Sequence, residues 1–237
     1  MMINSINGYN EKPESLGVTE LDTSDLEMMC YLYQPVKPIG SPYSHVNYFI
    51  EDRLYSFIPM INDCLLHEVE LGLGFEEVKN SYVYLTVKHL YVTPTYCANR
   101  PGWHTDGFGT EDINYTWCDK FPTLFNSSKF DNIDTTHTGS MKQFDTLALP
   151  ENDYELPVKT LTRLTPFVVH TTPKVVTETM RTFFKLSISK HPYNLKGNSK
   201  NPILGDMPWN FHDRSEVRNT ESFAGDSDFV VATRTKT

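Results

Sequence analysis

The most regular pattern in the chain is an alternation of side chains at residues 81–93, followed directly by Pro94. An extended strand projects successive side chains to opposite sides, and the aromatic and β-branched residues of this run favour strands. One face carries Val83, Leu85, Val87, His89 and Tyr91, and the other carries Tyr82, Tyr84, Thr86, Lys88 and Leu90. The run therefore predicts a long strand that ends at the proline.

Shorter strand-like runs follow, separated by turn-forming residues, and helical periodicity is scarce after residue 75. Residues 126–142 are rich in Asn, Ser, Asp, Thr and Gly and are interpreted as a polar connection. The predicted strands lie at residues 113–117, 121–125, 161–172 and 182–189, and residues 150–160 are expected to hold a turn and a short strand. Short strands in this number predict a mainly β chain folded as a sandwich or barrel.

Residues 45–71 differ from the rest, because their apolar side chains recur near helical spacing. Pro59 is expected to start a new helix or to kink this one, and Gly72 and Gly74 are expected stops. A length of 237 residues suits a single domain. We expect an N-terminal arm at 1–45, a helical region at 46–75, a β core at 80–190 and a wrapping segment at 191–237 with a closing strand at 229–232.

The composition restricts the class of protein. A hydrophobic content of 39% and an aromatic content of 13% are typical of a folded chain. The net charge of -9 argues against a broad surface for nucleic acid or anionic membrane. No apolar run approaches the length of a membrane span, and the N-terminus lacks the features of a signal peptide. The four cysteines, Cys30, Cys64, Cys97 and Cys118, are read as free thiols of a cytoplasmic protein.

A candidate metal site begins at His104 and Asp106, two residues apart with glycines on both sides. Residues at this spacing project to the same side of an extended chain but to nearly opposite sides of a helix. Pro101 and Gly102 favour the extended form here. An imidazole nitrogen and a carboxylate oxygen are suitable ligands for a divalent metal ion. The tripeptide alone is a weak signal, because a histidine near Gly and Asp is more often a turn residue.

Two later residues strengthen this interpretation. His170 ends an apolar strand-like run and is the best third ligand. Two histidines and one carboxylate leave coordination positions open, as a metal oxygenase requires. Arg181 follows eleven residues later, at the start of the next strand, where its guanidinium can pair with a carboxylate co-substrate. Without these roles, His170 is a core or surface histidine and Arg181 forms an ordinary salt bridge.

The order His104-Thr105-Asp106, then His170, then Arg181 resembles the Fe(II)/2-oxoglutarate-dependent dioxygenase superfamily, over residues 80–190. The resemblance implies a double-stranded β-helix, or jelly-roll, core with the N-terminal helices packed outside. It implies Fe(II) held by the two histidines and Asp106, with Arg181 on the distal carboxylate of 2-oxoglutarate. O₂ is the other co-substrate, and succinate and CO₂ are released as an unidentified substrate is oxidised.

Further contacts are expected from the same resemblance. Many members carry Ser or Thr two residues after the arginine, but this chain has Phe183 there. Tyr84 or Tyr91 on the preceding strand are therefore candidates for a further 2-oxoglutarate contact. The substrate pocket is expected to involve Arg100, Trp103 and Phe108, which flank the proposed mouth. The substrate is expected to be a small molecule, with a protein side chain or a nucleobase still open.

Two other readings use the same residues. The His104, Asp106 and His170 set could hold zinc with an activated water, giving a hydrolase. Alternatively, the chain is a non-catalytic jelly-roll binding module whose histidines only pack. Weaker signals are a metal loop at Asp131, Asp134 and His137, and a thiol nucleophile formed by Cys97 or Cys118 with His89.

Overall fold

The long alternating run forms strand β3 (Tyr82–Val92), which pairs antiparallel along its whole length with β9 (Thr179–Ser189). The structure is a computed structural model that describes residues 8–37 and 48–213. β3 and β9 lie near the middle of a six-stranded sheet, called here the large sheet, of order β1-β7-β4-β9-β3-β2. Its other strands are β1 (Glu14–Val18), β2 (Met29–Lys37), β4 (Ile113–Cys118) and β7 (Thr160–Leu164).

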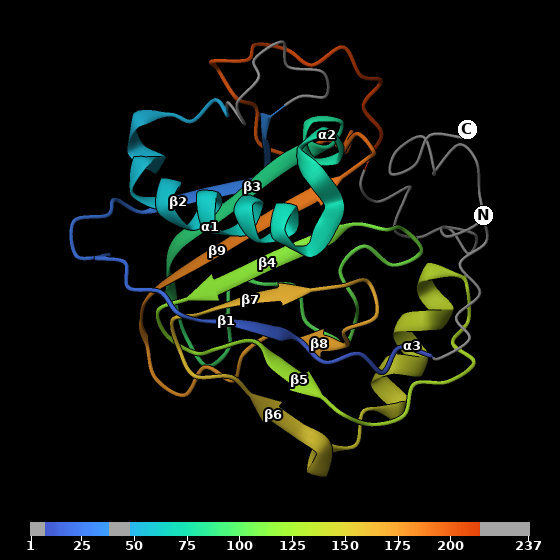
Figure 1. The fold of residues 1–237 in the computed structure, drawn as a ribbon. Coiled ribbons are helices and arrows are strands. Elements are labelled where there is room, and N and C mark those ends of the chain that lie inside the picture. Colours follow the sequence, from blue (N-terminus) through green and yellow to red (C-terminus); the bar gives the residue numbers. More distant parts are fainter. Residues whose placement is uncertain (1–7, 38–47, 214–237) are drawn as a thin grey trace.

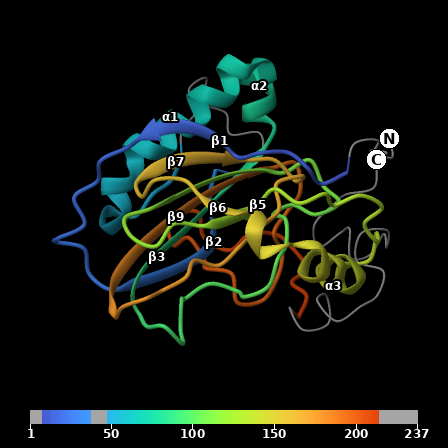
Figure 2. The same ribbon diagram turned by 90° about the horizontal axis from the view of Figure 1, so that it is seen from below.

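A small sheet of order β6-β5-β8 forms the second layer. It consists of β5 (Leu124–Asn126), β6 (Asp153–Glu155) and β8 (His170–Thr171). His104 extends this sheet, because its backbone N–H and carbonyl both bond to those of His170. From β3 onward the chain passes back and forth between the two sheets, which is the jelly-roll arrangement predicted for the core (Figure 2).

The N-terminal helices cover the outer face of the large sheet (Figure 1). A 3₁₀ turn (Asp52–Phe57) leads into α1 (Ile58–Glu68), a π-helical turn (Val69–Leu73) and α2 (Gly74–Lys79). Pro59 lies in the first turn of α1, as predicted, where its missing N–H is not needed. Gly72 interrupts the helix with a φ of 97°, but α2 follows it, so this glycine is a kink and not a final stop.

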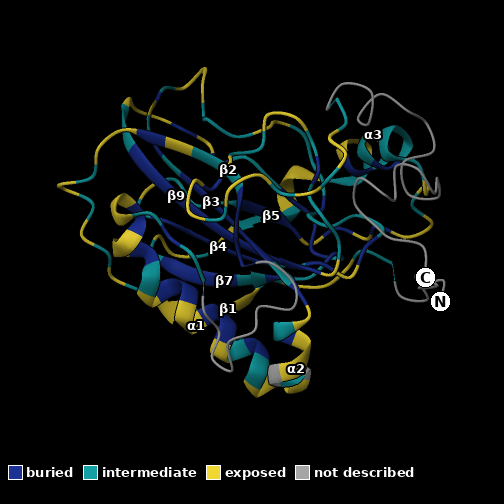
Figure 3. Ribbon diagram, turned by 90° about the horizontal axis from the view of Figure 1, so that it is seen from above, coloured by how far each residue is buried: buried dark blue, intermediate teal, exposed yellow. Residues whose placement is uncertain are grey.

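The apolar core lies between α1 and the large sheet, whose strands β3, β4, β7 and β9 are mostly buried (Figure 3). Phe57, Met60 and Ile61 of the helical segment pack there. The strands supply Val83, Leu85, Val87, Tyr115, Trp117, Phe184, Leu186 and Ile188. Trp117 is thus a core residue, and its indole N–H donates to the carbonyl of Thr19. The face of β3 that carries Val83, Leu85 and Val87 is therefore the side that faces the helices.

The N-terminal arm is more ordered than predicted, because its described part contributes β1 and β2 to the two edges of the large sheet. β1 gives little sequence signal, since only Leu16 packs against the core. Pro35 lies within β2, and an edge strand tolerates a residue that has no N–H to donate.

Two other predictions need correction. Residues 161–172 do not form one strand: β7 belongs to the large sheet and β8 to the small one, with a turn at Thr165 and Pro166 between them. The polar segment 126–142 includes the start of α3 (His137–Leu147). Thr136 caps α3 by accepting from the N–H of Gly139, and Phe144 anchors it by burial.

The C-terminal segment wraps back over the sheet as far as residue 213, where the description ends. Tyr193 stacks on Tyr84 of β3 with ring centroids 4.0 Å apart. The strand predicted at residues 229–232 lies outside the described residues. No helix in the described part of the chain is long and apolar enough to span a membrane.

Candidate metal centre

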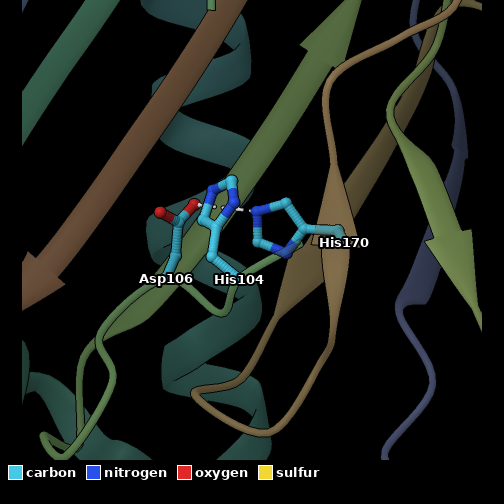
Figure 4. Close-up of side chains that lie close together, drawn as sticks. All are labelled: His104, Asp106 and His170. Carbon is cyan, nitrogen blue, oxygen red and sulfur yellow. Dashed lines mark ion pairs between the residues drawn. The ribbon is translucent and has the colours of Figure 1, made fainter. Parts of the chain in front are cut away.

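His104, Asp106 and His170 come together at the edge of the small sheet (Figure 4). One ligand atom from each lies within 4.8 Å of the others, and this is the single such cluster among the described residues. His170 Nε2 lies 3.5 Å from Asp106 Oδ2. The backbone pairing of His104 with His170 fixes two ligands, and the extended chain carries the third to the same side, as predicted.

Both histidines are oriented through their other ring nitrogen. Nδ1 of His104 lies 2.8 Å from the carbonyl oxygen of Gly102, and Nδ1 of His170 lies 3.0 Å from that of Val168. A carbonyl only accepts, so each Nδ1 carries a proton and donates it, and Nε2 is the ring atom left for a metal. Burial and the neighbouring His170 lower the pKa of His104 to about 4, so this ring is neutral at physiological pH.

Asp106 is held in its charged form by Lys185 of β9. The ammonium Nζ lies 2.7 Å from Asp106 Oδ2, and both groups are largely buried. Burial disfavours either charge, but the attraction between them outweighs it. The pKa of Asp106 is consequently lowered well below its usual value and that of Lys185 is raised. His104 and Asp106 are therefore in the protonation states that metal binding requires.

A cavity of about 350 Å³ opens beside the three ligands. The inner face of the large sheet, which points away from the helices, supplies much of its wall. Thr86 and Lys88 of β3, Thr116 of β4, and Phe183 and Lys185 of β9 line it. Strand pairing places Thr116, Lys185 and Thr86 in one row across β4, β9 and β3. Basic side chains therefore outnumber acidic ones in the cavity lining, although the chain carries a net charge of -9.

Arg181 does not line this cavity, in contrast to its predicted role. It is buried on β9, but its Nε donates to the carbonyl of Lys120 at 2.8 Å, and its Nη2 donates to that of Phe121 at 3.0 Å. The guanidinium ties the β4–β5 connection to the sheet. The structure thus brings together three of the four residues in the predicted order and gives the fourth a structural contact.

Tyr84 and Tyr91 also lie away from the cavity. Tyr84 is buried under Tyr193, and its hydroxyl donates to the carbonyl of His191. Tyr91 is 48% exposed, and its hydroxyl donates to Glu178. Both hydroxyls are therefore bonded to groups outside the cavity lining.

The predicted pocket residues divide in a similar way. Arg100 and Phe108 line the cavity, and Nη2 of Arg100 lies 3.3 Å from Nε2 of His137 on α3. Trp103 instead packs against the apolar cluster beneath α3, and its backbone N–H donates to Oδ1 of Asp145. Sequence reasoning missed Lys88 and Lys185 as cavity residues, although the alternation of β3 and β9 places each on the inner face.

The weaker sites predicted from sequence find little support. Asp134 accepts from the N–H of Thr136 before α3 and belongs to no metal cluster of the described residues. His89 bonds to Thr182, and neither Cys97 nor Cys118 is its partner. All four cysteines are free.

Comparisons with known proteins give distant likenesses. No protein-family model matches the chain, and no curated protein sequence matches it. EvdO2 from Micromonospora carbonacea var. aurantiaca matches with a TM-score of 0.35 and 11% identity over 57% of this chain and 64% of that one. The non-heme alpha-ketoglutarate dependent epimerase SnoN from nogalamycin biosynthesis matches with a TM-score of 0.32 and 10% identity, over 55% of this chain and 57% of the SnoN chain. The nickel complex of the non-heme monooxygenase ThoJ matches with a TM-score of 0.31 and 10% identity, over 59% of this chain and 54% of the ThoJ chain.

These matches span less than two thirds of the EvdO2, SnoN and ThoJ chains. They are too distant to carry an argument about function, which therefore rests on the geometry of the site.

Proposed function

We propose that this chain is a non-heme Fe(II) oxygenase that uses 2-oxoglutarate as a co-substrate to oxidise a small molecule. The observation that carries the proposal is the cluster of His104, Asp106 and His170 beside a cavity lined by Lys88 and Lys185, with Nδ1 of both histidines bonded to backbone carbonyls. Two histidines and one carboxylate with open positions are typical of non-heme iron oxygenases.

The donor set fits a divalent metal ion on its own chemistry. Each imidazole is oriented by a backbone carbonyl, as metal-bound histidines usually are. Lys185, on β9 of the large sheet, forms an ion pair with the Asp106 carboxylate. The bound iron would supply the activation of O₂, and the chain would hold it through these three side chains.

The cavity supports the choice of a small, acidic ligand beside the metal. Its volume of about 350 Å³ suits a small molecule. Lys88, Lys185 and Arg100 line it, whereas Asp106 is its one acidic side chain among the described residues. An organic acid such as 2-oxoglutarate would balance this positive charge.

The test is an anaerobic titration of the protein with Fe(II) and then 2-oxoglutarate. The proposal predicts a weak visible absorption band that needs both additions, and succinate on admission of O₂ with a panel of candidate substrates. His104→Ala is the control and should give no band. If the wild type gives neither the band nor succinate, while zinc alone supports hydrolysis of a test ester, the hydrolase reading replaces this one.

A further inference from the structure

The inner face of the large sheet carries three buried or half-buried basic residues, and they differ in what balances their charge. Lys185 is paired with Asp106, and Arg181 is bonded to the carbonyls of Lys120 and Phe121. Lys88 donates to the carbonyl of Ala98 at 2.7 Å and to Oδ1 of Asn99 at 2.9 Å, both neutral acceptors. None of the ion pairs formed by the described residues includes Lys88.

The surroundings of Lys88 are unfavourable for a cation in the absence of an anion. Burial is the main cause that lowers its pKa to about 8, and the charges of Lys185 and Arg181 act in the same direction. A buried charge is normally paired, because transfer from water is costly without a partner of opposite sign. The position is therefore suited to receive an anionic group that arrives with a ligand.

The groups around Lys88 can complete such a site. Phe183 pairs with Lys88 across β3 and β9, and the ammonium lies 5.9 Å from the centre of its ring. Thr116 and Thr123 line the same cavity and offer hydroxyl groups. An ammonium with nearby hydroxyl donors is a suitable environment for a carboxylate.

We propose that Lys88, and not Arg181, binds the carboxylate of the ligand that enters the metal cavity. The inference rests on the proposed function, under which this group is the distal carboxylate of 2-oxoglutarate. It assigns a binding role to a residue of β3 that the sequence motif did not include, and it leaves Arg181 as a residue that holds the β4–β5 connection.

A purely structural role for Lys88 is the competing explanation, and the chain contains a matched example. Lys37 of β2 is 1% exposed, donates to the carbonyls of Lys79 and Ser81, and has its pKa lowered to about 8 by burial. Lys37 lies outside the metal cavity. A lysine that only ties a loop to a strand should behave like Lys37 when it is replaced.

The experiment compares two 2-oxo acids on the protein loaded with Co(II), by calorimetric titration. 2-Oxoglutarate carries the distal carboxylate and pyruvate lacks it, so their affinity ratio reports on the group that recognises it. Lys88→Met and Lys88→Gln should weaken 2-oxoglutarate binding by about 10- to 100-fold, as for loss of a charged hydrogen bond. Pyruvate binding should change little, and Lys88→Arg should keep most of the preference for 2-oxoglutarate.

The control variants are Lys37→Met and Arg181→Gln, which should keep the wild-type affinity ratio even where their thermal stability falls. Unchanged Co(II) affinity in either Lys88 variant shows that the variant is folded. The inference is overturned if the wild type prefers 2-oxoglutarate and the Lys88 variants do so equally, or if Arg181→Gln alone loses the preference. Should the Co(II)-loaded wild type bind neither acid, the proposed function fails as well.

Discussion

The two faces of the large sheet use the same strands for different purposes. On the outer face, Val83, Leu85 and Val87 of β3 lie under α1 and are completely buried. On the inner face, Thr86 and Lys88 of the same strand line the metal cavity. The outer face is apolar and closed by a helix, whereas the inner face is polar and open to a ligand.

Successive side chains of one strand therefore belong alternately to the apolar core and to the cavity lining. Burial of apolar area on the outer face stabilises the fold by a non-directional effect that tolerates many residue types. The inner face depends instead on named partners, such as Lys185 with Asp106. Changes on the outer face should therefore alter the free energy of unfolding, and changes on the inner face should alter binding.

The largest effect on stability is expected from Phe184→Ala on the outer face. Phe184 is fully buried and stacks with Phe57, with ring centroids 6.1 Å apart. Its truncation should lower the free energy of unfolding by about 3–5 kcal/mol. Urea denaturation measures the loss, and Co(II) affinity of the folded fraction should stay the same. A loss of metal affinity without a loss of stability would contradict the division between the two faces.

The next effect concerns Asp112, a buried carboxylate directly before β4, and its dependence on pH. Burial raises the pKa of Asp112 to about 6, although hydrogen bonds, including one from Tyr193, oppose this. The unfolded chain releases this proton at lower pH than the folded chain, so the contribution of Asp112 to stability falls as the pH rises from about 4 to about 6. The shift corresponds to about 3 kcal/mol. Urea denaturation should show that Asp112→Asn loses about 3 kcal/mol less stability than the wild type between pH 4 and pH 6. Equal losses in the two proteins would disprove this role of Asp112.

A smaller effect is expected where the backbone turns beside the metal ligands. Gly107 has a φ of 74°, and a Cβ added there would lie 2.9 Å from Cβ of Asp112. Gly107→Ala should destabilise the fold by about 1–3 kcal/mol and weaken Co(II) binding, because it displaces the adjacent Asp106. Gly17→Ala is a control, since its φ is also positive but its surroundings are open. If only stability changed, the turn would not position the ligand.

The smallest effect is expected from Tyr91→Phe. The hydroxyl of Tyr91 is exposed and bonds to Glu178, far from the cavity lining. The free energy of unfolding should change by no more than about 0.5 kcal/mol, and 2-oxoglutarate affinity should not change. A clear loss of affinity would restore Tyr91 as a co-substrate contact.

Much of the fold was predictable because its longest strands are regular. β3 and β9 alternate over many residues, and β4 is close to its predicted range. β8 contains only two residues, so no periodicity could separate it from β7. α3 was missed because its sequence is polar and its stability depends on the Thr136 cap and on burial of Phe144.

The candidate site was predictable to the extent that it depends on sequence-local geometry. The spacing of His104 and Asp106 sets their common direction on an extended chain, and His170 follows from the paired strand. The role of Arg181 was not predictable, because the carbonyls that bind it come from the β4–β5 connection about 60 residues earlier. Lys88 and Lys185 could be assigned to a face of a strand, but not to a cavity.

The most direct test of the metal centre is an isothermal titration of the purified protein with Co(II). The wild type should bind one ion per chain. His104→Ala, Asp106→Ala and His170→Ala should each weaken binding by more than about 100-fold, beyond the loss typical of outer-sphere changes. The thermal stability of the two histidine variants should stay close to that of the wild type, whereas Asp106→Ala should lower it because Lys185 is then buried without its partner. Wild-type affinity in all three variants would contradict the account, because the ion would then be held elsewhere.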